Sequence, residues 1–138
     1  TWATEIGFYS KSKPRLVLSK QVVKRGISGG VTFLGITGSV LGALIIGFFA
    51  ESILRMNDLL LPLAVAGFIG SLTDSILGAY IQAKFKCSIC NEQTKDRYHC
   101  NIKSKLISGS KWIDNDAVNF INTIIGANVA YFLWMNYG

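Results

Sequence analysis

The chain has 138 residues, and 50% of them are hydrophobic while only 16% are charged, against about 25% in an average soluble domain. This composition excludes a disordered tail and argues against an ordinary soluble globule, with three buried helices in a large soluble core as the alternative to a membrane protein. The net charge is +6, but the basic residues avoid the apolar stretches, so we expect membrane lipid as a partner and no nucleic acid polymer.

Residues 1–27 form a basic segment that we expect to lie in the cytoplasm. Its last cations come shortly before two glycines at the start of the first apolar run, where free amides and the helix dipole favour an anion. We therefore predict a phosphate-binding site here, with a strip facing lipid headgroups and glycines that merely relieve crowding as the alternatives. The predicted phosphate-binding residues are Lys13, Arg15, Lys24, Arg25, Gly29 and Gly30.

Three runs of the chain are long enough to cross a bilayer, which takes about 20 residues. They are residues 28–50, residues 59–82 and residues 116–138. The first run carries no charge, and Asp74 is the only charged residue of the second. Small residues follow one side of each run, which is typical of closely packed helices. We predict an all-α membrane protein, a bundle of about three transmembrane helices with a basic cytoplasmic loop, as part of a larger polytopic bundle.

The distribution of Lys and Arg predicts the orientation of the chain. Residues 1–27 hold six of them and residues 83–115 hold seven, whereas the turn at residues 51–58 holds only Arg55. Two spans separate the two basic segments, so both lie on one side of the membrane, and the positive-inside rule makes that side the cytoplasm. The turn and the C-terminus are then expected outside.

Two groups of acidic residues could carry chemistry. Asp74 lies eight residues before the end of its run, about 12 Å along a helix. An acid at that depth predicts a functional site, with a structural acid paired to a missing helix as the alternative. At the start of the third run, Asp114 and Asp116, with Asn115 and Asn119, could hold a divalent cation that Asp74 approaches from the neighbouring helix. Simple capping of that helix by one Asp is equally compatible with the sequence.

The loop at residues 83–115 contains all three cysteines and the single histidine of the chain. Cys87 and Cys90 have the usual spacing of a zinc knuckle, and the adjacent His99 and Cys100 complete a set of four soft ligands. These residues fit a structural zinc ion, with free thiols or a redox pair as the alternatives. An odd number of clustered cysteines does not suit a secreted disulfide framework.

Five motifs in a fixed order resemble the integral membrane family that includes plant phytyl-phosphate kinase and animal transmembrane protein 19. The motifs are TWATEIG (1–7), SKPRL (12–16), GGVT (29–32), GSLTDSILGA (70–79) and DNDAVN (114–119). The resemblance covers essentially the whole chain. Members of this family carry several more spans before this region, so we expect the chain to be the C-terminal half of such a protein, with the missing N-terminal helices as its partners.

The resemblance implies a kinase that uses a nucleoside triphosphate, CTP in the plant enzyme, to convert an isoprenoid monophosphate such as phytyl phosphate to its diphosphate. The expected cofactor is Mg²⁺. A transporter or flippase of a phosphorylated lipid, and a non-catalytic membrane scaffold with a zinc-binding loop, are the alternatives. The residues expected to organise magnesium, either directly or as helpers, are Asp74, Asp114, Asp116, Asn115, Asn119 and Glu5.

Overall fold

The computed structural model describes residues 2–137, so Thr1 of the first motif and Gly138 of the third predicted span lie outside the described residues. The helices are α1 (Trp2–Phe8), α2 (Phe33–Leu54), α3 (Leu60–Tyr80) and α4 (Asn115–Tyr137). The strands are β1 (Arg15–Leu16), β2 (Gly30–Val31), β3 (Lys84–Lys86), β4 (Gln93–Thr94), β5 (Tyr98–His99), β6 (Ile102–Lys103) and β7 (Lys105–Ser108). Helices α2, α3 and α4 are each long and apolar enough to cross a membrane, which confirms the predicted three-helix membrane architecture.

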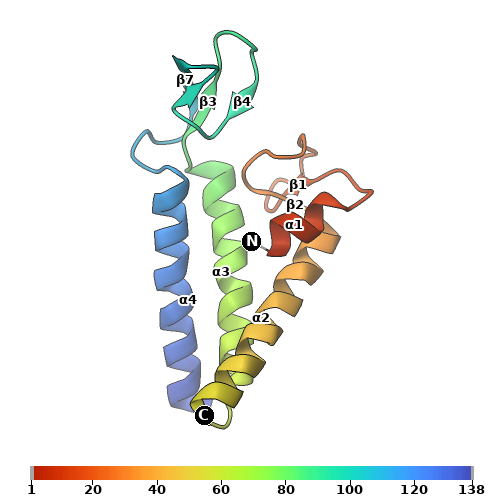
Figure 1. The fold of residues 1–138 in the computed structure, drawn as a ribbon, viewed down its shortest axis with the longest axis vertical. Coiled ribbons are helices and arrows are strands. Elements are labelled where there is room, and N and C mark those ends of the chain that lie inside the picture. Colours follow the sequence, from red (N-terminus) through yellow and green to blue (C-terminus); the bar gives the residue numbers. More distant parts are fainter. Residues whose placement is uncertain (1, 138) are drawn as a thin grey trace.

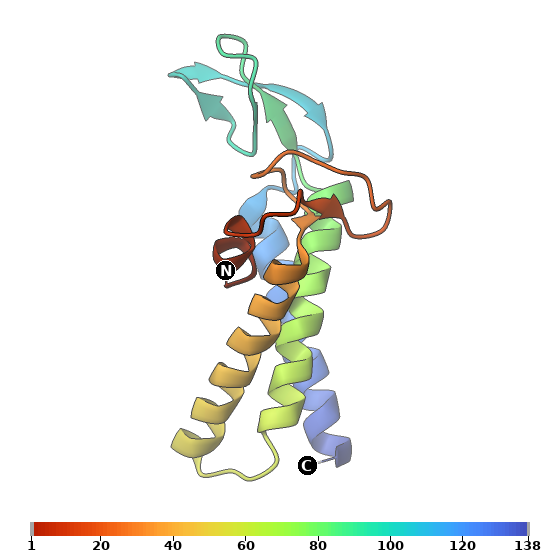
Figure 2. The ribbon, with the colours of Figure 1, turned by 90° about the vertical axis from the view of Figure 1, so that its right-hand side faces the viewer.

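The three long helices form a bundle in which α3 packs against both α2 and α4 (Figure 1). All the strands lie at one end of this bundle, and the C-terminus and the α2–α3 turn lie at the other (Figures 1 and 2). We call the first of these ends, formed by residues 9–32 and 81–114, the basic end. Both basic segments of the sequence therefore meet on one side, as their separation by two spans predicts.

Helix α2 is shifted along the sequence relative to the predicted span. It begins at Phe33 instead of residue 28 because strand β2 pairs with β1 just before it. Thr32 then caps the helix, since its hydroxyl accepts a hydrogen bond from the amide of Gly35 at 3.0 Å. The helix continues to Leu54 and ends where Arg55 adopts a left-handed conformation with φ of 54°.

The short helix α1 lies alongside α2 instead of outside the bundle (Figure 1). A Cβ atom on Gly38 would come within 2.9 Å of Ile6, and one on Gly42 within 3.0 Å of Trp2. Glycines at these positions allow the two helices to approach closely. Because Gly42 lies nine residues into α2, Trp2 is about 14 Å below the start of that helix.

Small residues also join α3 to its two neighbours. A Cβ atom on Gly67 would lie 2.9 Å from the side chain of Ala43 in α2. A Cβ atom on Gly126 of α4 would lie 3.6 Å from the carbonyl oxygen of Ala66 in α3. The predicted small-residue faces are thus helix-packing surfaces, and most large apolar side chains point away from them.

The outward surfaces of the helices are strongly apolar. Only 6% of the most apolar stretch of α4 is buried within the described part of the chain. Large exposed side chains on this helix are Phe120, Ile124, Tyr131, Phe132 and Met135. A surface of this kind is stable against lipid and would promote aggregation in water.

The loop at residues 83–115 folds into short strands, an addition to the predicted all-α architecture. Strands β4, β3 and β7 form an antiparallel sheet in that order, and β5 pairs with β6. Two backbone hydrogen bonds cross the base of this subdomain. The amide of Ala83 donates to the carbonyl of Ile113 at 2.8 Å, and the amide of Ser110 donates to the carbonyl of Ile81, directly after α3, at 2.9 Å. Strands of two to four residues are too short for an alternating apolar pattern to mark them in the sequence.

Candidate functional site at the basic end

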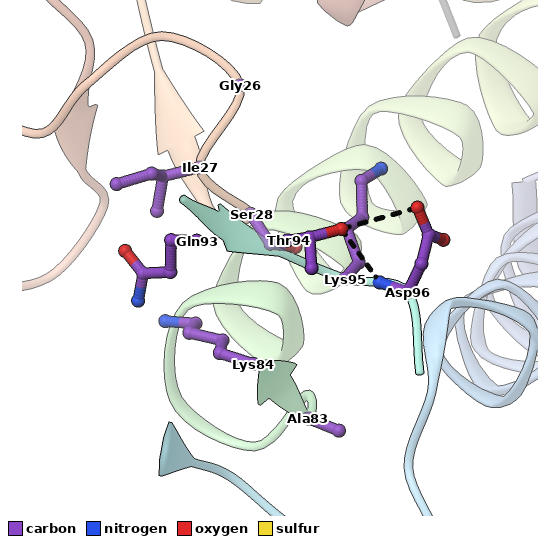
Figure 3. A pocket seen from close by; sticks show the side chains of 9 residues that line it. All are labelled: Gly26, Ile27, Ser28, Ala83, Lys84, Gln93, Thr94, Lys95 and Asp96. Atoms are coloured by element: carbon purple, nitrogen blue, oxygen red, sulfur yellow. Dashed lines mark hydrogen bonds between the residues drawn. The ribbon is translucent and has the colours of Figure 1, made fainter. Parts of the chain in front are cut away.

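A pocket of about 200 Å³ opens at the basic end, between the loop before β2 and the strands β3 and β4 (Figure 3). Its wall combines polar and apolar surface and carries two cations, Lys84 and Lys95, beside one acid, Asp96. The other lining residues are Gly26, Ile27, Ser28, Ala83, Gln93 and Thr94. The pocket therefore combines residues 26–28 with a part of the Cys/His loop that the sequence did not single out. None of the six predicted phosphate-binding residues lines it, although residues 26–28 lie between Arg25 and Gly29.

The two pocket lysines are tied to the ends of the neighbouring helices. The ammonium of Lys84 donates to the carbonyl of Ala79 near the end of α3, and partial burial lowers the pKa of this lysine. A cation at the end of a helix also interacts favourably with the helix dipole. Lys95 donates to the amide oxygen of Asn115, the first residue of α4, at 3.4 Å.

The four cations predicted to bind phosphate lie at this same end. Within the described residues, three of them are free of ion pairs, whereas the fourth is hydrogen-bonded to the backbone. Lys13, Arg15 and Lys24 are exposed, and within residues 2–137 they form no ion pair. The guanidinium of Arg25 instead donates to the carbonyls of Phe8, at 3.1 Å, and Ser10, and lies 5.9 Å from the ring centre of Phe8. Arg25 thus fixes the end of α1 to the loop, while the other three remain available to an anion.

The glycine pair before α2 serves packing more than anion binding in this structure. The amide of Gly30 donates to the carbonyl of Ile27 at 3.2 Å, so it does not point freely at a ligand. Gly29 has φ of +82°, and a Cβ atom there would lie 2.4 Å from the backbone nitrogen of Ala79. Only glycine fits this close approach of the loop to α3.

Asp74 is paired with a residue that the sequence analysis missed. The amide group of Asn122 in α4 donates to Oδ1 of Asp74 in α3 at 3.1 Å, and both side chains are half-buried. Asp74 lies six residues before the end of α3 and Asn122 seven residues after the start of α4, so the two share a depth of about 9–11 Å. Counting residues from the basic end of each predicted span places Asn122 at nearly the same depth as Asp74, and this comparison could have identified Asn122 from the sequence.

The two aspartates at the start of α4 have separate environments. Asp114 caps the helix, because its Oδ1 accepts from the amide of Ala117 at 3.1 Å, while its Oδ2 forms an ion pair with Arg97 at 3.3 Å. Asp116 is exposed, and its side chain makes no hydrogen bond or ion pair within the described chain. Of these two acids, only Asp116 has both carboxylate oxygens free.

The structure does not bring the predicted magnesium residues together into one cluster. Asp116 and Asn122 are six residues apart, about 9 Å along α4, so Asp116 lies well above the level of Asp74. Asn119 is exposed on α4, Asn115 contacts Lys95, and Glu5 is exposed on α1. Asp74, Asp114 and Asp116 therefore lie at one end of the bundle without sharing one ion site in the described residues.

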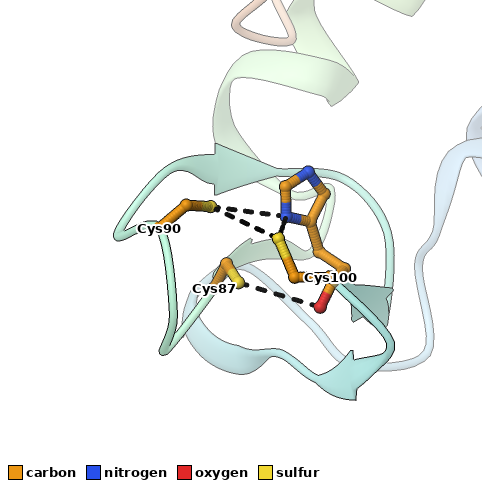
Figure 4. Close-up of side chains that lie close together, drawn as sticks. Cys87, Cys90 and Cys100 are labelled. Atoms are coloured by element: carbon orange, nitrogen blue, oxygen red, sulfur yellow. Dashed lines mark hydrogen bonds between the residues drawn. The ribbon is translucent and has the colours of Figure 1, made fainter.

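The Cys/His loop does form a cluster that could hold a metal ion (Figure 4). The ligand atoms of Cys87, Cys90, His99 and Cys100 all lie within 4.8 Å of one another. Among residues 2–137, this is the one group of three or more such side chains. The set predicted from the sequence is thus the one that the fold assembles.

Spanning helices, a half-buried intramembrane carboxylate and a basic end define a multi-pass integral membrane protein. The profile of the family described as "Integral membrane protein DUF92" matches residues 1–127, and the chain belongs to this family. It is 38% identical over 137 residues to "Protein PGR" of Arabidopsis thaliana, covering 91% of this chain and 46% of the relative. It is 32% identical over 109 residues to an uncharacterized membrane protein of Methanocaldococcus jannaschii, covering 79% and 42%.

The chain spans less than half the length of these curated relatives. No solved structure matches it.

Proposed function

We propose that the protein is a membrane-embedded kinase that converts an isoprenoid monophosphate such as phytyl phosphate to the diphosphate, with CTP as the phosphoryl donor. An oxygen of the monophosphate attacks the terminal phosphorus of the nucleotide, the bond to the bridging oxygen breaks, and the nucleoside diphosphate leaves. This transfer needs no covalent enzyme intermediate. The protein has to position the phosphates and neutralise their charge.

The observation that carries the proposal is the accumulation of free positive charge beside a pocket that contains two lysines at the membrane boundary. Arg97–Asp114 is the one ion pair within residues 2–137, so most cations of the basic end are not neutralised by the protein. An excess of cations in one place attracts anions and raises their local concentration. The phosphate of a lipid whose chain lies in the bilayer would reach this same boundary.

The size of the pocket favours the phosphates over the whole nucleotide. Pockets for drug-sized ligands measure about 300–1,000 Å³. With about 200 Å³, this pocket suits a chain of phosphate groups, held by Lys84 and Lys95 and by the exposed Lys24 nearby in sequence. The nucleoside would then extend beyond the pocket.

The described residues can supply one carboxylate ligand to a magnesium ion, and they do not form a complete magnesium site. In phosphoryl-transfer sites Mg²⁺ is typically bound by one or two carboxylates together with the substrate phosphates, without a complete protein cage. Asp116, with two free carboxylate oxygens at the membrane boundary, meets that requirement. Bound there, magnesium would neutralise charge on the transferring phosphates. Asp114 is occupied by its cap and ion pair, so we assign it to positioning α4.

We assign Asp74 to the part of the site that faces the bilayer. Its Oδ2 and the Oδ1 of Asn122 accept no hydrogen bond within the described chain, so the pair offers two oxygen atoms to a cation. Asp116 lies about 9 Å along α4 from the level of Asp74 and Asn122, so one ion cannot contact both carboxylates. Each carboxylate would then hold a separate cation, and the two cations would neutralise different phosphates. An ionisable residue at this depth in a membrane helix is costly and usually functional.

The proposal is tested by incubating the complete protein with phytyl monophosphate, Mg²⁺ and each of the four common nucleoside triphosphates in turn. We expect the diphosphate to form, fastest with CTP. No diphosphate with any nucleotide would contradict a kinase. Movement of the monophosphate across vesicle membranes without nucleotide would instead support the transporter.

Replacing Asp116 is expected to weaken magnesium use. In Asp116→Asn the half-saturating concentration of Mg²⁺ should rise about 10-fold, because a charged ligand becomes neutral while the helix start is retained. The measurement is the initial rate of diphosphate formation against Mg²⁺ concentration. Asp58→Asn, the same change of an exposed acid at the opposite end of the bundle, should leave the curve unaltered. An unaltered curve in Asp116→Asn as well would remove Asp116 from the site.

Replacing Asp114 separates capping from metal binding. Asn caps a helix about as well as Asp, so Asp114→Asn should lose only the exposed ion pair, at a cost of about 0.2–1 kcal/mol, and should retain its rate. Asp114→Ala should lose about 1 kcal/mol more as the cap disappears. Thermal unfolding in detergent and the initial rate together check this. A large fall in the rate of Asp114→Asn at unchanged stability would assign a magnesium role to Asp114.

A further inference from the structure

We propose that Cys87, Cys90, His99 and Cys100 bind one zinc ion, and that this ion fixes the wall of the phosphate pocket. The metal would be structural, because all four positions are filled by protein ligands. The inference does not depend on the kinase activity. It rests on the geometry of the cluster and on where the loop leads.

The spacing of three of the four ligand atoms agrees with tetrahedral zinc, and the Sγ of Cys87 lies within 4.8 Å of each of them. Bonds of about 2.3 Å to sulfur and about 2.0 Å to nitrogen place two sulfurs about 3.8 Å apart, and a sulfur and a nitrogen about 3.6 Å apart. The Sγ atoms of Cys90 and Cys100 are 3.9 Å apart, and they lie 3.5 and 3.3 Å from Nδ1 of His99 (Figure 4). Unrelated side chains have no reason to adopt three such distances together.

The backbone around Cys87 is shaped to hold a metal-bound sulfur. Cys87 is fully buried, its amide donates to the carbonyl of Glu92, and its carbonyl accepts from Asn91, so a tight turn surrounds the thiol. The turn fixes the position of the Cys87 sulfur beside the other three ligand atoms.

The cysteine sulfurs of the cluster need a cation at their centre when they are bound as thiolates. The ligand atoms of all four residues lie within 4.8 Å of one another, so three thiolates there would repel one another. A divalent ion at their centre removes that repulsion. In the described residues, no Lys or Arg side chain is hydrogen-bonded to any of the three sulfurs.

The position of the cluster gives the ion a consequence for the pocket. Residues 93–96, which line the pocket, lie between Cys90 and His99 in the sequence. A zinc ion bound by Cys90 and His99 would close residues 91–98 into a short loop and reduce their conformational freedom. Arg97, the next residue, then reaches Asp114 and the carbonyl of Lys111, at 3.3 and 3.1 Å, at the start of α4.

The first test is metal content. We expect the complete protein, purified in detergent under reducing conditions without chelator, to carry about one zinc ion per chain. Cys90→Ser and Cys100→Ser change exposed residues and should lose most of the zinc, while Ser88→Ala, an exposed position between two ligands, should retain it. Replacement by Co²⁺ should give thiolate-to-cobalt charge-transfer absorption that weakens in each Cys variant.

Three results would overturn the zinc site. They are a zinc content near zero in the unaltered protein, unchanged zinc in the Cys90→Ser/Cys100→Ser double variant, and a Cys90–Cys100 disulfide found by mass spectrometry in the reduced preparation.

The second test concerns the pocket wall formed by residues 93–96. Chelation should increase hydrogen exchange of residues 93–96 and leave the centre of α3 unchanged. Unchanged exchange of residues 93–96 after zinc removal would overturn the role of the ion in the pocket.

Discussion

Asp74→Asn is expected to abolish most phosphoryl transfer while the protein stays folded. The new amide oxygen can still accept the hydrogen bond from Asn122, so the contact between α3 and α4 is retained and only the negative charge is removed. Removal of one strong electrostatic contact from an active site costs about 100-fold or more in rate. The measurement is the rate of diphosphate formation at saturating nucleotide and lipid phosphate, compared at equal thermal stability.

The companion variant keeps the Asp74 carboxylate and removes its partner. Asn122→Ala removes the hydrogen bond and one of the two oxygen atoms that the pair offers to a cation, and an interhelical hydrogen bond in a membrane protein contributes about 0.6 kcal/mol. We expect a small loss of stability and a smaller loss of rate than in Asp74→Asn. If Asp74→Asn kept its rate and Asn122→Ala lost stability, Asp74 would be a structural acid that joins the two helices.

Gly29→Ala is expected to destabilise the protein by about 2–4 kcal/mol, since the substitution combines a left-handed backbone with a collision against α3. The Cβ atom would lie 2.4 Å from the backbone of Ala79, and neither segment has room to move away without losing its own contacts. The shift of the thermal midpoint in detergent measures this effect. The loss is expected with or without any anion present.

Gly26→Ala separates the two contributions. Gly26 has φ of +87°, close to that of Gly29, but no atom lies within 4 Å of the position its Cβ would take. It should therefore lose only about 1 kcal/mol, the cost of the left-handed conformation. Equal losses in the two variants would show that the contact with Ala79 does not limit the fold.

The sequence predicted the features of this protein that depend on local residues. Long apolar runs with at most one charged residue identified the three spanning helices, because the transfer of each run into lipid depends on its own composition. The spacing of Cys87, Cys90, His99 and Cys100 identified the cluster for the same reason, since its members lie in one short loop. The family resemblance rested on motifs of four to ten residues and was confirmed by the profile match.

Features that depend on contacts between distant segments escaped prediction. Helix α1 has seven residues, too few to be stable alone, and its packing on Gly38 and Gly42 is a tertiary effect. The start of α2 moved because β2 pairs with residues 15–16. The prediction that Asp74, Asp114 and Asp116 meet at one ion depended on how α3 and α4 are positioned along the bundle axis. The sequence does not give that position, and in the structure it places Asn122, not Asp116, beside Asp74.

The junction between α3 and the strand subdomain is closely packed. A Cβ atom on Gly109 would lie 2.0 Å from the carbonyl oxygen of Gln82, and the amide of Ser110 donates to the carbonyl of Ile81 at 2.9 Å. Contacts this close are expected to oppose bending between the end of α3 and the pocket wall. A shift of the end of α3 is therefore expected to carry Lys84 with it, so that a change in the packing of the helices would alter the position of a pocket cation.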